Sequence, residues 1–187
     1  MGDYKYELKD SLYLNLANRC NNSCTFCIKF KTRDFENTFH LWLDREPKVE
    51  EIIKSIHDPR KYKQIVFCGF GEPLIRLEAV KELAKYFHEQ GAYVRIDTDG
   101  QANLFHQRDI TPELSGYVDE MNISLNAHDK DAYNKLCRSL FKDRAYPAIV
   151  DFAKHAKEHI SKVVLSVVGL ASVDTKGCEI IARELGL

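Results

Sequence analysis

Five short apolar segments, each followed by a stretch with helical periodicity, constrain the fold of this chain more than any other feature. They are rich in β-branched and aromatic side chains, which favour strands, and they cover residues 12–18, 64–69, 93–98, 118–126 and 162–170. Two of them lack polar alternation around Val66 and Val164, which is typical of strands covered on both faces. Strands and helices in regular alternation predict an α/β fold with a parallel sheet.

The segments between the strands carry helix signals. Pro47 suits a first helical turn, Asp129 can cap a helix at its start, and Gly186 can end one. Helices are predicted near residues 49–56, 77–90, 130–140, 149–160 and 176–185. Such units form an open doubly wound sheet or a barrel, and 187 residues leave room for about six of the eight units of a complete barrel. We expect one domain spanning residues 1–187.

Three of the six cysteines, Cys20, Cys24 and Cys27, follow the first predicted strand directly. Strand–helix enzymes carry their chemistry in such loops at the carboxyl ends of strands. Three thiolates on one loop can hold an iron–sulfur cluster or a metal, although ordinary [4Fe–4S] carriers and structural zinc sites use four ligands. An open coordination position would make the site catalytic, whereas His40 could close a Cys3His zinc site. Both interpretations stay open at this point.

The spacing C-x3-C-x-Φ-C, with Phe26 as the aromatic residue, resembles the signature of the radical S-adenosylmethionine (SAM) enzymes. Residues 69–73 resemble that family's Gly-Gly-Glu-Pro turn, with Phe70 in place of the first glycine. Residues 97–100 resemble its Asp-Thr-Asn-Gly segment, with Asp99 in place of asparagine. The resemblance implies a partial TIM barrel with a [4Fe–4S] cluster and SAM at the strand ends. The implied cluster ligands are Cys20, Cys24 and Cys27, and the implied SAM-binding residues are Phe26, Gly71, Glu72, Pro73, Asp97, Thr98, Ser124, Asn126 and Val168.

Further segments narrow this resemblance. Asn18-Arg19-Cys20 and the stretches 40–47, 66–69 and 102–110 are similar to the TatD-associated radical SAM proteins, and the similarity extends over nearly the whole chain. That subgroup implies a functional link to a TatD-type metal-dependent hydrolase, but it implies no settled substrate.

The family resemblance also implies a reaction. A one-electron reductant of the flavodoxin or ferredoxin type reduces the cluster, and the cluster reduces SAM. The resulting 5′-deoxyadenosyl radical takes a hydrogen atom from a small-molecule or protein substrate. The sequence assigns no catalytic residue. Two alternatives remain: a zinc-binding or redox-responsive interaction module without SAM cleavage, and an activase that makes a glycyl radical in a protein partner.

The remaining cysteines and one long connection need separate interpretations. Cys68, Cys137 and Cys178 each share a strand or stripe with apolar residues, so we predict that they pack as small buried side chains. The segment 28–46 is long for a loop and is predicted to be a lid that contacts substrate. Its candidate contact residues are Lys29, Lys31, Arg33, His40 and Trp42, joined by His106 and Arg108 beyond the third strand.

Charge and hydropathy weigh against other classes of protein. With 27 basic and 28 acidic residues the net charge is −1, so the chain lacks the positive excess that nucleic-acid binding requires. No apolar segment is long enough to span a bilayer or to act as a signal peptide, and we expect a cytoplasmic chain with reduced thiols. A sixth parallel strand would begin near Leu187, where the sequence ends. We therefore expect the fifth strand to be an exposed edge unless another chain covers it.

Overall fold

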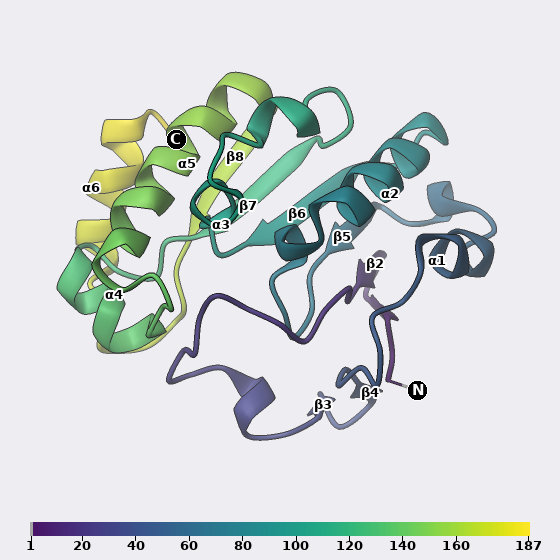
Figure 1. Cartoon of the computed structure of the whole chain (residues 1–187), viewed down its shortest axis with the longest axis horizontal. Coiled ribbons are helices and arrows are strands. Elements are labelled where there is room, and N and C mark those ends of the chain that lie inside the picture. The colour runs from purple at the N-terminus through teal and green to yellow at the C-terminus, as the bar shows by residue number, and fades with distance from the viewer. Residues whose placement is uncertain (1) are drawn as a thin grey trace.

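A computed structural model describes residues 2–187 and shows a six-stranded sheet with helices packed against it (Figure 1). The strands, in their order across the sheet, are β1 (Lys5–Leu8), β2 (Ser11–Leu14), β5 (Gln64–Phe67), β6 (Val94–Thr98), β7 (Glu120–Ser124) and β8 (Lys162–Ser166). From β2 to β8 all neighbouring strands are parallel. The five predicted strands and the α/β class are confirmed. All but β6 end earlier than predicted, because the chain turns out of the sheet there to form the loops of the candidate site.

Helices follow the strands as the sequence predicts. They are α1 (Val49–Ser55), α2 (Leu77–Glu89), α3 (Ala102–His106), α4 (Lys130–Cys137), α5 (Ala145–His159) and α6 (Thr175–Leu185). Short 3-10 turns are η1 (Ile28–Phe30), η2 (Pro59–Lys61), η3 (Pro73–Arg76), η4 (Thr111–Leu114) and η5 (Lys142–Arg144). The Asp129 side chain accepts a hydrogen bond from the Ala132 N–H and caps α4, and Gly186 ends α6 in the left-handed region. The five-residue α3 was not predicted, because so short a helix has no full apolar stripe.

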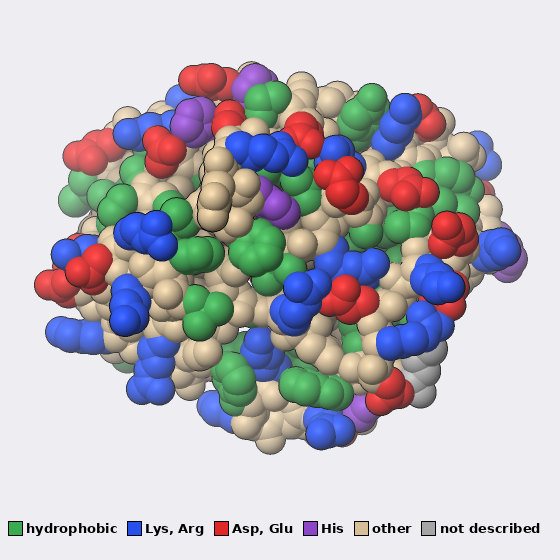
Figure 2. Space-filling model, viewed as in Figure 1, with side chains coloured by type: hydrophobic (Ala, Val, Ile, Leu, Met, Phe, Trp, Pro, Cys, Tyr) green, Lys and Arg blue, Asp and Glu red, His purple; other side chains and the backbone are tan. Residues whose placement is uncertain are grey.

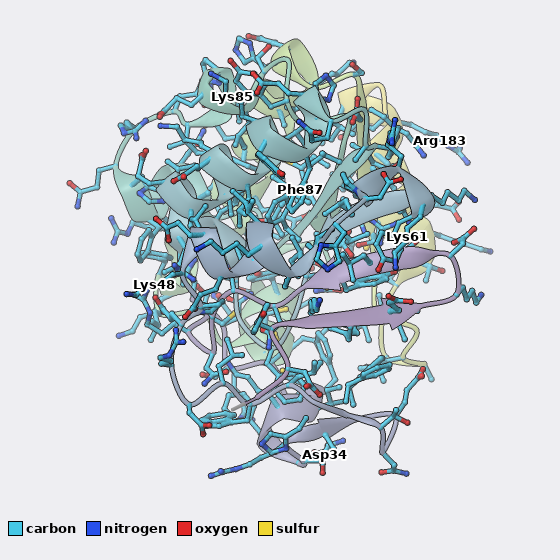
Figure 3. The ribbon with its side chains drawn as sticks, turned by 90° about the vertical axis from the view of Figure 1, so that its right-hand side faces the viewer. Asp34, Lys48, Lys61, Lys85, Phe87 and Arg183 are labelled. Atoms are coloured by element: carbon cyan, nitrogen blue, oxygen red, sulfur yellow. The ribbon has the colours of Figure 1, made fainter. Side chains whose placement is uncertain are left out.

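The main hydrophobic core lies between the helices and one face of the sheet. Alternate strand residues point into it, among them Leu14, Phe67, Ile96 and Ile123, all essentially inaccessible to solvent. Phe87 of α2 points into the same interior (Figure 3). This core fixes the register of the parallel strands, so the residues at their carboxyl ends are held in one row.

The opposite face of the sheet is more polar than predicted. In β6 and β7, buried residues alternate with half-buried polar ones, including Arg95, Asp97, Asn122 and Ser124. The prediction of strands covered on both faces holds for β5, where Ile65, Val66 and Phe67 are all buried, and is wrong for β8, whose residues after Lys162 are only half-buried. Strand β8 is an edge strand, so its apolar side chains have neighbours on one side only.

The segment predicted as a structureless lid contains a small hairpin. Turn η1 is followed by β3 (Asp34–Phe35) and β4 (Phe39–His40), which pair with each other and lie below the sheet in Figure 1. Phe35 and Phe39 pack on the ring of Tyr6 in β1, with ring centroids 6.1 and 5.4 Å apart. Asp34 lies at the end of the molecule opposite α2 (Figure 3). The hairpin therefore covers the polar face of the sheet at its β1–β2 side.

The sixth strand of the sheet is not the one expected after the fifth helix. It is β1, which precedes β2 in the sequence, pairs with it antiparallel and occupies the edge away from β8. Its sequence KYEL has a single buried apolar residue, Tyr6, and two charged residues facing outward. Such a pattern is typical of an edge strand and is too short to be distinguished from a turn.

Candidate functional site

The three clustered cysteines lie on a loop after β2, at the carboxyl edge of the sheet; we call residues 20–27 the cysteine loop. Main-chain hydrogen bonds fasten this loop to the end of α4. The Ser23 N–H donates to the carbonyl of Cys137 at 3.1 Å, and the Thr25 N–H donates to that of Leu136 at 2.9 Å. The loop is therefore held through its backbone, and its three half-buried thiols remain available.

A buried network of polar side chains holds the cysteine loop from beneath. The amide nitrogen of Gln101 donates to Asn22 Oδ1 at 3.0 Å and to the Tyr133 hydroxyl at 3.1 Å. Asn22 Nδ2 donates to the same hydroxyl at 2.9 Å, and Ser139 Oγ donates to Gln101 Oε1 at 2.5 Å. All four side chains are at least nine-tenths buried. The network joins the cysteine loop to the end of β6 and to α4.

Glu72 connects the turn after β5 to the end of β6. One carboxylate oxygen accepts hydrogen bonds from Thr98 Oγ1 at 2.8 Å and from the Leu74 N–H at 3.0 Å, and the other accepts from the Asp99 N–H at 2.6 Å. Burial, and then the charge of the neighbouring Asp99, raises the pKa of the Glu72 carboxyl well above its usual range. Glu72 and Thr98, both predicted to bind SAM, are thus brought together by bonds that shape the site.

Asp99 approaches the first cysteine. Its Oδ2 lies 4.0 Å from Cys20 Sγ, and burial raises the pKa of the Asp99 carboxyl to about 6. Burial, with the charges of Asp99 and Glu72, raises the pKa of the Cys20 thiol. A hydrogen bond with the Cys137 thiol, with burial, raises the pKa of Cys24 in the same way. In the metal-free chain these thiols hold their protons, so metal binding must displace them.

The turn after β5 lies directly against the chain that leads into the cysteine loop. A Cβ atom on Gly71 would stand 2.2 Å from the carbonyl oxygen of Ala17, and one on Gly69 would stand 2.2 Å from Asn15 Oδ1. Both positions therefore require glycine. Phe70, which replaces a glycine of the resembled motif, has no left-handed backbone angle and is buried in the aromatic cluster with Tyr6. The turn accepts the larger residue because its side chain points into that cluster.

The remaining predicted SAM-binding residues lie along the same strand ends. Asn126, in the left-handed region at φ 58°, accepts a hydrogen bond from the Val168 N–H at 2.9 Å, which brings these two together. Ser124 is paired across the sheet with Ser166. Asp97 points to the polar face and forms an ion pair with Arg95 at 2.9 Å, and burial raises its pKa. Phe26 is half-buried against the main core, and Pro73 starts η3.

Replacing Asn126 by alanine is expected to lower the free energy of unfolding by about 2 kcal/mol, because the bond to Val168 is lost and a non-glycine residue without a polar side chain is strained at positive φ. Asn126→Gly, which removes the bond and relieves the strain, should cost about 1 kcal/mol. Chemical denaturation measures both. SAM affinity should fall in both variants because the segment around Val168 is released, and an unchanged affinity would remove Asn126 from the SAM site.

Several residues predicted to contact substrate have partners inside the protein. His106 Nε2 lies 2.8 Å from the carbonyl oxygen of Leu74, and Arg108 is paired with Glu113. His40 is exposed in the hairpin and bonded to Asp34 at 2.7 Å through Nδ1. Among residues 2–187 the structure shows no group of three or more His, Cys, Asp or Glu side chains already arranged to hold a metal ion.

Two of the segments that suggested the TatD-associated subgroup contact each other. The side chain of Asn18 accepts a hydrogen bond from the Leu43 N–H at 3.0 Å and donates one to the Leu43 carbonyl at 2.7 Å. The next residue, Arg19, pairs with Glu46 at 2.8 Å. The segment before the cysteines and the segment after the hairpin therefore form one unit around the entrance to the cysteine loop.

Comparison with known proteins shows which family this chain belongs to. Residues 14–180 match the sequence profile of the Radical SAM superfamily. The chain belongs to that superfamily. Over 99 residues it is 40% identical to the protein named "Putative glycyl-radical enzyme activating enzyme MJ1227" of Methanocaldococcus jannaschii, an alignment that covers 53% of this chain and 38% of the relative. The chain therefore spans well under half of that relative's length.

Solved structures show the same fold. A structure of TYW1 with a lysine-pyruvate adduct bound superimposes with a TM-score of 0.65 at 17% identity, covering 95% of this chain and 62% of that one. A structure of native anSMEcpe with bound AdoMet gives a TM-score of 0.63 at 16% identity, covering 92% and 47%. At such identities the likeness concerns the fold, and it supports a partial barrel of strand–helix units.

The cofactors of this superfamily are a [4Fe–4S] cluster and SAM, and the donor set of the cysteine loop fits the cluster. Three half-buried thiols lie on one loop, and Cys20 Sγ already accepts a hydrogen bond from the Asn22 N–H at 3.4 Å. Hydrogen bonds of this kind to sulfur are typical of iron–sulfur ligands.

Among residues 2–187, no helix is long and apolar enough to cross a membrane.

Proposed function

We propose that the chain is the core domain of a radical SAM enzyme that cleaves SAM reductively and uses the 5′-deoxyadenosyl radical to take a hydrogen atom from a substrate. The observation that carries the proposal is the cysteine loop, because its three thiols lie at the carboxyl edge of the parallel sheet and a buried network fixes the loop there. The bound cluster supplies the electron that breaks the sulfur–carbon bond of SAM.

In this proposal the residues of the chain bind, orient and shield. Cys20, Cys24 and Cys27 would hold the cluster through their thiolates. Glu72 keeps the turn after β5 and the end of β6 at a fixed separation, so that the backbone of this turn can receive SAM. The hairpin over β1 and β2 limits the access of water to the polar face of the sheet. The SAM-binding residues we propose are Phe26, Gly71, Glu72, Pro73, Asp97, Thr98, Ser124, Asn126 and Val168.

Anaerobic reconstitution with iron and sulfide, followed by reduction with dithionite in the presence of SAM, tests the proposal. We expect a brown protein with about four irons per chain, a paramagnetic signal of the reduced cluster that changes when SAM is added, and release of 5′-deoxyadenosine. A fully loaded cluster that binds SAM but yields no 5′-deoxyadenosine would contradict it.

An activating function toward a protein partner is the second candidate. It is favoured by the 40% identity, over 99 residues, to the protein of Methanocaldococcus jannaschii named "Putative glycyl-radical enzyme activating enzyme MJ1227". In this case the substrate is the backbone of a glycine in the partner, which loses a hydrogen atom and keeps the radical. A stable protein radical that forms only when a partner is present, detected by electron paramagnetic resonance, distinguishes this candidate from an enzyme acting on a small molecule.

The TatD-associated subgroup remains the finer proposal. It rests on the resemblance of residues 18–20, 40–47, 66–69 and 102–110 to that subgroup, and the first two of these segments contact each other through Asn18 and Leu43. A functional link to a TatD-type hydrolase follows from that subgroup and is proposed with it, as is a cytoplasmic location.

A further inference from the structure

The cysteine loop runs antiparallel to the end of α4 and the residues that follow it. Asn22 and Ser139 form a β-bridge between the two segments. Further along the loop, the Thr25 N–H donates to the carbonyl of Leu136 at 2.9 Å. Between these two contacts the loop advances as many residues as the other segment goes back, so the two segments keep one antiparallel register.

In this register Cys24 lies opposite Cys137, the last residue of α4. Cys137 is completely buried in the main core, and Cys24 packs against the same core. The Cys137 thiol is the hydrogen-bond partner of Cys24. One of the three proposed cluster ligands therefore has a second thiol beside it that lies outside the cysteine motif.

Cys137 lies on the face of α4 that the cysteine loop covers. Tyr133, one turn earlier on this helix, is also completely buried, and its hydroxyl accepts a hydrogen bond from Asn22 Nδ2 at 2.9 Å. The two side chains therefore point to the same loop. Tyr133 contacts a residue that positions the loop, whereas Cys137 contacts a ligand sulfur directly.

The direction of the hydrogen bond between the two thiols follows from ligation. A cysteine that binds iron has lost its proton, so a ligated Cys24 can only accept. The hydrogen of the pair then lies on Cys137, whose S–H is a weak donor. Hydrogen bonds to the sulfurs of a cluster are among the factors that set its reduction potential. The bond is stronger to the more negative, reduced cluster, and it therefore stabilises that state.

Charges at the protein surface have a weaker influence on this potential. Figure 2 shows Lys and Arg side chains interspersed with Asp and Glu side chains over one face of the molecule, and the net charge of the whole chain is −1. Charges of opposite sign offset each other, and salt screens those exposed to solvent. A buried group in contact with a ligand sulfur therefore has the larger effect for its size.

We propose that Cys137 is a positioning residue that donates a hydrogen bond to the ligating sulfur of Cys24 and raises the reduction potential of the cluster. The inference rests on the proposed function, because it requires the cluster. On reduction the cluster takes up one electron and passes from its 2+ to its 1+ state, and Cys137 keeps its hydrogen in both states. Cys137 is thus neither a ligand nor a proton donor in the reaction, and it acts on how readily the cluster is reduced.

Cys137→Ala and Cys137→Ser test the inference. The measurement is the midpoint potential of the reconstituted cluster, obtained without SAM by redox titration followed by electron paramagnetic resonance. Cys137→Ala removes the donor, so we expect the equilibrium constant for reduction to fall about fivefold, which lowers the potential by about 40 mV at 59 mV for each tenfold change. Cys137→Ser keeps a small side chain with one donor, and it should recover most of this difference.

Cys178→Ala is the matched control. Cys178 is also a buried free cysteine, but it lies on α6, outside the cysteine loop. This variant should keep the wild-type potential. A fully loaded Cys137→Ala protein with the wild-type potential would overturn the inference and leave the proposed function intact. Equal shifts in Cys137→Ala and Cys137→Ser would also overturn it, because packing and not the donor would then be responsible. Absence of SAM cleavage by the fully loaded wild type with dithionite would instead overturn the proposed function.

Discussion

Replacing any one of Cys20, Cys24 and Cys27 by alanine is expected to abolish formation of 5′-deoxyadenosine. Iron retained after reconstitution should fall from about four atoms per chain to below about one, because two thiolates cannot hold a cluster that normally needs protein ligands on most of its irons. Each of the three variants should give the same loss, since in the proposed site each thiolate would be the sole protein ligand of one iron. Iron and sulfide analysis, together with the reduced-cluster signal, measures the effect.

These variants should nevertheless remain folded. The cysteine loop is held by the main-chain bonds of Ser23 and Thr25 to α4 and by the side chain of Asn22, and none of these uses a thiol. Circular dichroism and the thermal transition of the metal-free protein should therefore stay close to those of the wild type. These two measurements on the metal-free variants distinguish loss of the cluster from loss of the fold.

Cys178→Ala and Cys137→Ala are the controls for this prediction. Both residues are free and buried, and Cys178 lies on α6, outside the loop. Both variants should keep the full iron content. Cys137 is the sharper control because its thiol is the hydrogen-bond partner of Cys24. Retention of four irons and of activity by a Cys20 variant, or loss of iron from the Cys137 variant alone, would show that the ligand set is wrongly assigned.

The elements that the sequence predicted correctly are those with strong local signals. Strands β5 and β8 contain continuous apolar runs, β6 and β7 alternate apolar with polar residues, and the ends of α4 and α6 have a capping aspartate and a terminating glycine. The three cysteines are recognisable because their spacing lies within one loop. Such signals act over a few residues and need no knowledge of the rest of the chain.

Elements that depend on tertiary contacts were missed. Strand β1 has two charged residues in four, and the paired strands β3 and β4 have two residues each, so neither shows a periodic pattern. They are stabilised by Tyr6, Phe35 and Phe39 packing across the polar face of the sheet. The role of Glu72 was anticipated only as a cofactor contact, whereas its carboxylate also fastens two strand ends to each other. These roles follow from distances between residues that are far apart in the sequence.

The polar network under the cysteine loop is the clearest case of a feature that depends on residues far apart in the sequence. Gln101 lies 79 residues from Asn22 and 32 from Tyr133, so no spacing rule connects them. A glutamine after a strand and a tyrosine in a helix are each ordinary residues. Their importance arises from complete burial, since a buried polar group that lacks a partner costs about 1–3 kcal/mol.

Gln101→Ala is expected to lower the free energy of unfolding by about 3 kcal/mol, because Asn22 Oδ1 and the Ser139 hydroxyl lose their buried partner. The bond from Asn22 Nδ2 to Tyr133 would remain. The cysteine loop would then be held less firmly, so the reconstituted cluster should lose iron to a chelator several times faster than in the wild type. Chemical denaturation and chelation kinetics, both measured where the variant is still fully folded, give the two effects.

Gln64→Ala is the matched control, because Gln64 is a half-buried glutamine at the start of β5 whose side chain makes one long bond, 3.4 Å, to Arg95. This variant should lower the free energy of unfolding by less than about 1 kcal/mol and leave the rate of iron loss to the chelator unchanged. Tyr133→Phe, which removes one hydroxyl from the network and keeps the ring in the core, should fall between the two. If Gln101→Ala is destabilised but releases iron at the wild-type rate, the network supports the fold without positioning the cysteines. If both the stability and the rate change in the order Gln64→Ala, Tyr133→Phe, Gln101→Ala, the network positions the cluster ligands, and the fixed geometry of the loop comes from side chains outside the cysteine motif.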